Sequence, residues 1–242
     1  MKIKVLYEDS NILAIDKPSG ILVHPDERSK EKTILDLFIK KYPKLEIVHR
    51  LDQGTSGVML LAKNQKAYEF LKAQFQTRTI KKIYHAIVNG SVKNDRGVIN
   101  KPIGRSPKDF RRHLAGRGAR GEMREAITEY KVIKRFEAKT SQNFSSCALS
   151  RVRVGTLGDK NSEKFSLLEL KPKTGRTHQI RVHMKFLNHS VVCDSLYNPD
   201  QPCPKGISRM ALHAKSIEFQ NLQGKTIKVE SPLPKEFRKV VK

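Results

Sequence analysis

The order of the apolar segments constrains the fold of this 242-residue chain most strongly. Short apolar or alternating runs, of the kind that form β-strands, occur along the whole chain, and fewer segments repeat apolar residues at helical spacing. These runs do not alternate strictly with helices, as βαβ units would require. The sequence therefore predicts an α+β fold with a mixed, mostly antiparallel central sheet flanked by helices.

Turn and capping residues divide the chain into elements. Thr33, Asn64 and Thr177 are candidate helix N-caps, because each side chain can accept a hydrogen bond from the first helical turn. Pro234 suits the first turn of a C-terminal helix. The length fits a single domain spanning residues 1–242. Strands are expected at residues 3–7, 12–15, 57–62, 82–88, 127–133, 165–170, 212–219 and 226–229.

The charge balance indicates a polyanionic partner. Lysine and arginine total 48 against 24 acidic residues, a formal net charge of +24. Nucleic acid is the commonest such partner, since each phosphate contact releases condensed counterions; a solvated basic surface is the alternative. Residues 101–125 are rich in arginine, glycine and proline and predict a long basic loop. Residues 139–164 are polar and irregular and are expected to form an insertion.

The sequence lacks the patterns typical of membrane segments, secretion signals, nucleotide-binding loops and metal sites. The longest apolar run, residues 58–62, is far shorter than the ~20 residues of a membrane-spanning helix. No signal peptide, P-loop, G-x-G-x-x-G or metal-ligand spacing is present, so we expect no membrane contact, cofactor or metal. The three cysteines form no C-x-x-C pair, which favours reduced cysteines in the cytoplasm.

Two segments could carry chemistry. In residues 49–57, Asp52 lies between an apolar run and a Gly/Thr/Ser turn whose donors could keep its carboxylate ionised. A purely structural aspartate is an equal alternative there. In residues 171–183, a turn leads into a helix whose first turns carry Arg176, His178 and Arg181. Its free amides could bind a phosphate or the Asp52 carboxylate, or the segment could be an ordinary surface helix.

An aromatic residue in a basic strand suggests a contact with a nucleobase. Tyr84 lies within the segment KKIYHA, between lysines and a histidine. Such a ring can stack on a base, although a packed strand residue is the commoner explanation. The residue alone does not decide between the two.

Recognition of a family joins these segments. The run HRLDQGTSGVMLLAK (49–63) resembles the signature of RluA-type pseudouridine synthases. Similar matches follow at DKPSGILVHP (16–25), KKIYHAIVNG (81–90), LKPKTGRTHQIRVH (170–183) and LHAKSIEF (212–219). The chain differs where Ser190 and Cys193 replace the family's usual proline and glycine. From the resemblance we expect the chain to begin directly at the catalytic domain, without the N-terminal RNA-binding module of larger members.

The resemblance implies a fold and an activity. The fold would be that of a pseudouridine synthase, with two sub-lobes around a central RNA-binding cleft. The activity would be isomerisation of uridine to pseudouridine in structured RNA, by a monomer without a cofactor. Large-subunit (23S) ribosomal RNA is the expected substrate and transfer RNA the alternative. A non-catalytic RNA-binding or ribosome-assembly protein is the alternative of another class.

The resemblance also implies roles for individual residues. Asp52 would be the essential carboxylate and Arg181 its partner. Tyr84 would stack on the uracil and take the proton from its new carbon–sugar bond. Arg50 would fill the gap left by a flipped base. The remaining candidates are RNA contacts at Arg176, His178, Arg105, Arg111 and Arg112, and apolar pocket walls at Leu170 and Ile180.

Overall fold

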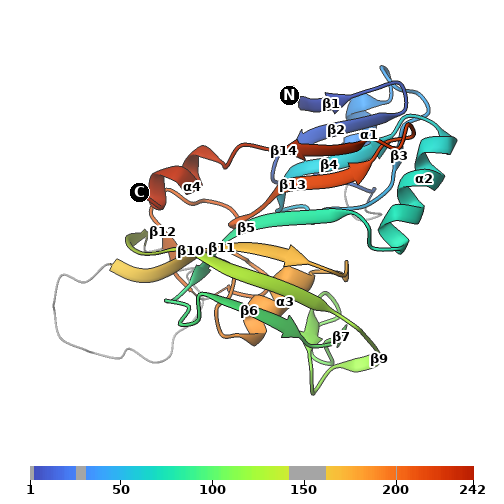
Figure 1. Cartoon of the computed structure of the whole chain (residues 1–242). Helices are drawn as coiled ribbons and strands as arrows, with labels where there is room; N and C mark the ends of the chain where they lie inside the picture. Colours follow the sequence, from blue (N-terminus) through green and yellow to red (C-terminus); the bar gives the residue numbers. More distant parts are fainter. Residues whose placement is uncertain (1–2, 26–30, 142–161, 200) are drawn as a thin grey trace, which may run out of the picture.

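The structure is a computed structural model that describes residues 3–25, 31–141, 162–199 and 201–242 (Figure 1). Within these residues, one large sheet has the strand order β1-β2-β4-β13-β5-β11-β10-β12, with β3, β6 and β14 paired to its side. Its strands are β1 (Lys4–Glu8), β2 (Ile12–Lys17), β3 (Glu46–Ile47), β4 (Ser56–Ala62), β5 (Lys81–Asn89), β6 (Arg96–Asn100), β10 (Ile127–Ser141), β11 (Ser162–Pro172), β12 (Cys203–Pro204), β13 (Leu212–Gln220) and β14 (Thr226–Glu230). The predicted α+β class is confirmed.

Strand alternation divides the N-terminal core between the two faces of the sheet. Successive side chains of a strand point to opposite faces, so Ile12, Val58 and Leu60 pack with the helix α2 (Gln65–Gln76). Their neighbours in the strands pack instead in a cluster that contains Ile34 of the helix α1 (Ile34–Phe38). Every residue of β4 is buried as a result.

The second half of the sheet builds its own core. Strands β5, β11 and β10 pair in antiparallel order, and the helix α3 (Gln179–Phe186) packs on β11. The helix α4 (Lys235–Val240) buries Phe237 in the same cluster. Figure 1 shows the two halves lying along one continuous twisted sheet, with α1 and α2 near one end and α3 near the other. This arrangement fits the two expected sub-lobes.

The strand β13 joins the two halves. It pairs in parallel with β4 on one side and antiparallel with β5 on the other. The approach to β4 requires glycine at position 57, where φ is +110° and a Cβ atom would overlap the carbonyl oxygen of Ala214. The end of β4 that follows the Asp52 turn is thereby held directly against β13.

The predicted basic loop 101–125 is wrong as a description of the backbone. These residues form a separate three-stranded antiparallel sheet of β7 (Ile103–Arg105), β8 (His113–Ala115) and β9 (Arg120–Arg124), in the order β8-β7-β9. β7 and β8 are too short to alternate, and β9 is exposed along its whole length, so the sequence shows no strand pattern here. Gly116, Gly118 and Gly121, which suggested a loop, adopt positive φ in and beside the connection between β8 and β9.

Helix starts agree with the sequence in two of three cases. Thr33 and Asn64 cap α1 and α2, each accepting a backbone N–H of the first turn. For α3 the expected cap at Thr177 is wrong, since His178 is the N-cap, with a left-handed φ of +55° and no side-chain capping bond. Among the described residues, no helix combines the length and apolar character needed to cross a membrane.

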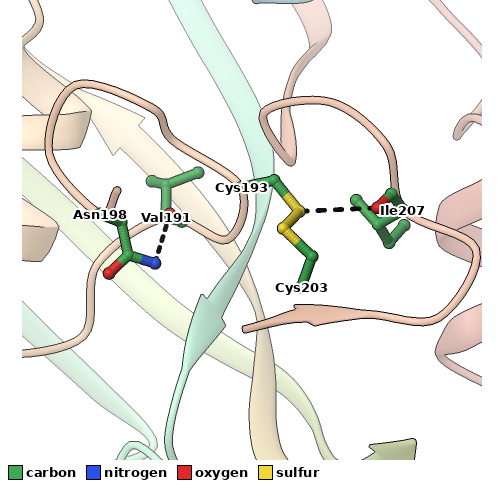
Figure 2. Close-up of a disulfide and its surroundings, with 5 residues drawn as sticks. All are labelled: Val191, Cys193, Asn198, Cys203 and Ile207. Carbon is green, nitrogen blue, oxygen red and sulfur yellow. Dashed lines mark hydrogen bonds between the residues drawn. A yellow bond between two sulfur atoms is a disulfide. The ribbon is translucent and has the colours of Figure 1, made fainter. Parts of the chain in front are cut away.

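Two further expectations change. The ends of the expected insertion 139–164 belong to β10 and β11, and residues 142–161 lie outside the described residues. Cys193 and Cys203 form a disulfide with their Cα atoms 5.5 Å apart, so the expectation of reduced cysteines does not hold for this pair (Figure 2). Cys147 lies outside the described residues. The disulfide ties the segment after α3 to β12.

Candidate active site

A buried lysine fixes the turn that carries Asp52. Lys17, at the end of β2, is fully buried, and its ammonium donates to the carbonyl oxygens of Pro18, Gln53 and Thr55 at 2.9–3.0 Å. All three ammonium protons thus have acceptors. Burial lowers the pKa of Lys17 to about 8, against the opposing effect of the Asp52 charge. The Lys17 ammonium therefore holds the turn after Asp52 through its backbone carbonyl oxygens.

Arg181 of α3 joins two carboxylates. Its Nη1 donates to Oδ2 of Asp52 at 3.0 Å, while its Nε and Nη2 donate to the two oxygens of Asp194 at 2.7 and 2.8 Å. Asp194 is 1% exposed and Asp52 is 21% exposed. Burial opposes the charged guanidinium, but the bonds and charge of Asp194, and then those of Asp52, outweigh it and raise the pKa of Arg181. The accessible carboxylate is that of Asp52.

Tyr84 and Asp52 line one cavity. The cavity has a volume of about 590 Å³, and Tyr84, Ile180 and Leu212 form apolar parts of its wall. Basic side chains also line it, from Arg78, Lys82 and Arg176. Burial, followed by the negative charge of Asp52, raises the pKa of the Tyr84 phenol. The cavity combines an aromatic face, one accessible carboxylate and a basic rim.

A second hollow of about 1010 Å³ meets the first at Asp52. Arg50, Asp52, His178 and Arg181 line both, and Arg209 contributes to the second alone. Arg50 is exposed, between the two openings. Asp52 can therefore be approached from two sides.

His178 lies beside Asp52 on the side away from Arg181's contact. Its Nε2 is 4.0 Å from Oδ1 of Asp52, and its Nδ1 is 3.0 Å from the hydroxyl oxygen of Tyr197. The rings of His113 and Tyr197 both meet the imidazole edge to face, with centroids 5.8 and 5.6 Å away. Burial is the main cause that lowers the pKa of His178 to about 4. The imidazole is neutral near pH 7.

The structure brings most of the predicted site residues together. Asp52, Tyr84, Arg181, Arg50, Arg176, His178 and Ile180 all line the first cavity. Arg105, Arg111 and Arg112 lie instead on the small sheet and its β7–β8 turn. That sheet reaches the site through His113 of β8, whose backbone N–H donates to the Tyr197 hydroxyl at 2.9 Å.

One predicted wall residue is wrong and three residues were missed. Leu170 does not line the cavity, because it is fully buried in the core cluster that includes Ile180 and Met184 of α3. Leu212, Lys17 and Asp194 were not singled out. Leu212 and Lys17 stand inside segments that resemble the family, and Asp194 directly follows Cys193, where the chain differs from it, so the comparison with the family is the available signal for them.

The donor set gives no metal site. In the described ranges, no group of three or more histidine, cysteine or acidic side chains is arranged to hold a metal ion. The carboxylates of Asp52 and Asp194 are both bound to Arg181.

Comparison with known proteins gives a consistent family. The family described as RNA pseudouridylate synthase matches residues 11–186. An uncharacterized RNA pseudouridine synthase of Bacillus subtilis is 33% identical over 98% of this chain and 70% of its own length. Proteins named ribosomal large subunit pseudouridine synthase D, from Xanthomonas campestris and Pseudomonas aeruginosa, are 33% and 35% identical. They align with 99% and 98% of this chain and with 68% and 70% of their own lengths.

Solved structures agree on the fold. Human RNA pseudouridylate synthase domain containing 1 superposes with a TM-score of 0.74 at 24% identity, over 96% of this chain and 83% of that one. Human RNA pseudouridylate synthase domain containing 4 gives a TM-score of 0.69 at 25% identity, over 97% of this chain and 90% of that one.

Proposed function

The chain belongs to the RNA pseudouridylate synthase family and is an RNA pseudouridine synthase, and from this premise we propose that it modifies large-subunit ribosomal RNA with Asp52 as the essential carboxylate. The reaction breaks the bond between ribose C1′ and uracil N1 and joins C1′ to uracil C5. The proton leaving C5 is balanced by one gained at N1. The observation that supports the proposal most is the accessible Asp52 carboxylate, which lines one cavity with Arg181 and Tyr84.

Asp52 is proposed to act as an anion. It could attack the sugar, attack the base, or remove a ribose proton, and each route requires the ionised carboxylate. The Arg181 guanidinium donates a hydrogen bond to its Oδ2 at 3.0 Å. Asp194 accepts from the Nε and Nη2 of Arg181, and Asp52 accepts a single hydrogen bond, from Nη1, so Asp52 keeps lone pairs for the substrate.

Tyr84 is proposed to stack on the uracil. Burial and the Asp52 charge raise the pKa of its phenol, so the neutral form persists at physiological pH. A neutral phenol is a good stacking surface but a poor base. The raised pKa therefore supports stacking, and it means that any transfer of the C5 proton to Tyr84 requires the phenolic proton to leave at the same time.

The RNA is proposed to present a flipped nucleotide to this cavity. A base paired inside a helix cannot reach an enclosed carboxylate, and extruding it costs a few kcal/mol. Arg50, exposed between the two hollows, is proposed to occupy the gap in the stack. The basic small sheet, with Arg105, Arg111 and Arg112, is proposed to contact the phosphate backbone.

The proposed substrate favours the cytoplasm, where ribosomal RNA is assembled. Cellular thiols reduce most disulfides there. The Cys193–Cys203 disulfide would then face reduction, unlike a disulfide in a secreted protein.

The proposal is tested by mapping pseudouridine across total RNA from cells with and without the gene. We expect one or more large-subunit sites to lose the modification and to regain it with the wild-type gene but not with Asp52→Ala. A loss of pseudouridine confined to transfer RNA would overturn the proposed ribosomal RNA target. Normal modification by Asp52→Ala would overturn the role of the carboxylate. If every pseudouridine is still present without the gene, the result supports the alternative of a non-catalytic RNA-binding or ribosome-assembly protein.

The same variant separates chemistry from binding in vitro. Asp52→Ala and the isosteric Asp52→Asn should both abolish conversion of unmodified ribosomal RNA. The affinity for that RNA should persist, since the basic surface supplies most of it. A loss of affinity equal to the loss of conversion would contradict a purely chemical role.

A further inference from the structure

The two carboxylate oxygens of Asp52 have different neighbours. Oδ2 accepts a hydrogen bond from Arg181 at 3.0 Å, whereas Oδ1 faces Nε2 of His178 at 4.0 Å. The second distance is too long for a hydrogen bond. Catalytic hydrogen bonds are often long in the free enzyme and shorten in the substrate complex, so a small movement of either side chain would close this gap.

Tyr197 decides which imidazole nitrogen of His178 carries the proton. The Tyr197 hydroxyl oxygen accepts the backbone N–H of His113 at 2.9 Å and lies 3.0 Å from His178 Nδ1. Tyr197 is 5% exposed, and a buried hydroxyl proton must be donated. In the described part of the chain, His178 Nδ1 is the acceptor available to it. Nδ1 is then unprotonated, and the proton of the neutral ring is on Nε2, facing Asp52.

The backbone of His178 supports a functional reason for this placement. Its φ of +55° is left-handed, a conformation that is unfavourable for a non-glycine residue. The ring is held between His113 and Tyr197, so its direction is fixed. A capping serine or asparagine would stabilise α3 better, yet the position holds a histidine without a capping bond.

We propose that His178 is a positioning residue for Asp52: its Nε2–H, selected by the Tyr197 hydroxyl, orients the carboxylate oxygen that Arg181 leaves free. The inference rests on the proposed role of Asp52. A neutral donor orients the anion without adding a second positive charge that would weaken it as a nucleophile or base. The charged and titratable groups around the ring are Asp52, Arg181, Asp194, His113 and Tyr197. Burial, Arg181 and His113 lower the pKa of His178 and outweigh the opposing charges of Asp52 and Asp194, so the ring is uncharged near pH 7.

A set of substitutions tests the inference by single-turnover kinetics on unmodified ribosomal RNA. His178→Ala should lower the rate constant by up to about 100-fold, the scale of a misplaced reacting group. His178→Gln, whose amide N–H can reach the Nε2 position, should recover most of the rate. His178→Asn suits the left-handed backbone but is too short, and should stay slow. RNA affinity should change less than the rate in all three.

A spectroscopic measurement gives a readout that a structural role would not move. In nitrogen-15 NMR of labelled wild-type protein, His178 should be the Nε2–H tautomer at pH 7. Tyr197→Phe keeps the ring but removes the hydroxyl, and should shift His178 toward a mixture of tautomers. Finding the Nδ1–H tautomer in the wild-type protein would overturn the inference, and this holds even if a His178 variant fails to fold.

Controls separate this inference from the proposed function. His189→Ala removes a histidine that contacts Asn89, away from Asp52, and should leave the rate unchanged. If Asp52→Ala is inactive while His178→Ala turns over normally, only the role of His178 is lost. If Asp52→Ala is active, the proposed function itself fails.

Discussion

The strand β4 and the small sheet of β7, β8 and β9 differ in how far their side chains are buried. Every residue of β4 is buried, whereas every residue of β9 is exposed. β4 lies between two apolar cores and begins four residues after Asp52. The small sheet is attached through a cluster of only four buried residues, Ile103, Ala126, Val182 and Tyr197.

The difference corresponds to the precision that each proposed task needs. A reacting carboxylate must be placed within a fraction of an ångström, and the Lys17 bonds and the β4 packing provide this. A phosphate contact tolerates movement, because its attraction is long-ranged and carries no sequence information. Substitutions in the buried region should therefore change stability and rate, and those in the small sheet should change affinity and salt dependence.

The largest effect is expected at Arg181. Arg181→Met leaves Asp194, 1% exposed, without its charge partner, which should lower the free energy of unfolding by about 3–5 kcal/mol. Arg181→Lys keeps a charge but not the planar fork that serves two carboxylates at once, so it should lose less stability and still lose most activity. Urea denaturation and single-turnover assays would measure both. Unchanged turnover in Arg181→Lys would contradict the pairing of Arg181 with Asp52.

A smaller effect is expected at Tyr84. Tyr84→Leu should weaken binding of the flipped base by about 1–3 kcal/mol, the usual worth of aromatic stacking, while Tyr84→Phe should keep that binding. Because burial raises the pKa of the phenol, its ionisation should begin only above the ordinary value of about 10. An ultraviolet difference titration of wild type against Tyr84→Phe would show this. A phenolate signal near pH 8 would contradict it.

The smallest effect per residue is expected on the small sheet. Replacing Arg111 or Arg112 with alanine should reduce the slope of log K against log salt by about 1 for each phosphate contact removed. The rate at saturating RNA should not change. Lys228→Ala on β14, near the opposite end of the molecule, is the matched control. If the control changes the slope as much, the small sheet is not the preferred RNA contact.

Local pattern predicted much of the fold. Apolar or alternating runs located the central strands, and the Thr33 and Asn64 side chains located two helix starts, because these signals depend on neighbours a few residues away. The third start was missed because His178 begins α3 without a capping bond. The β7–β9 sheet is not visible in the sequence, because β7 and β8 have three residues each and β9 is exposed along its whole length, so it has no apolar face.

The site depended on information that local pattern does not contain. Asp52 and Arg181 are 129 positions apart, and the spacing of residues says nothing about their meeting. The resemblance to a family supplied that pairing as an expectation. It did not supply the packing of α3 over Leu170 or the contact between Cys193 and Cys203. Both depend on the tertiary packing of this particular chain.

The place of β13 has a consequence for synthesis of the protein. Because β13 lies between β4 and β5, a nascent chain that has not yet extended past Gln220 cannot join the strand that follows Asp52 to the strand that carries Tyr84. Arg181 leaves the ribosome earlier but has no assembled partner. The site of a newly made molecule therefore forms only after β13 has been synthesised, later than the segments that carry Asp52, Tyr84 and Arg181.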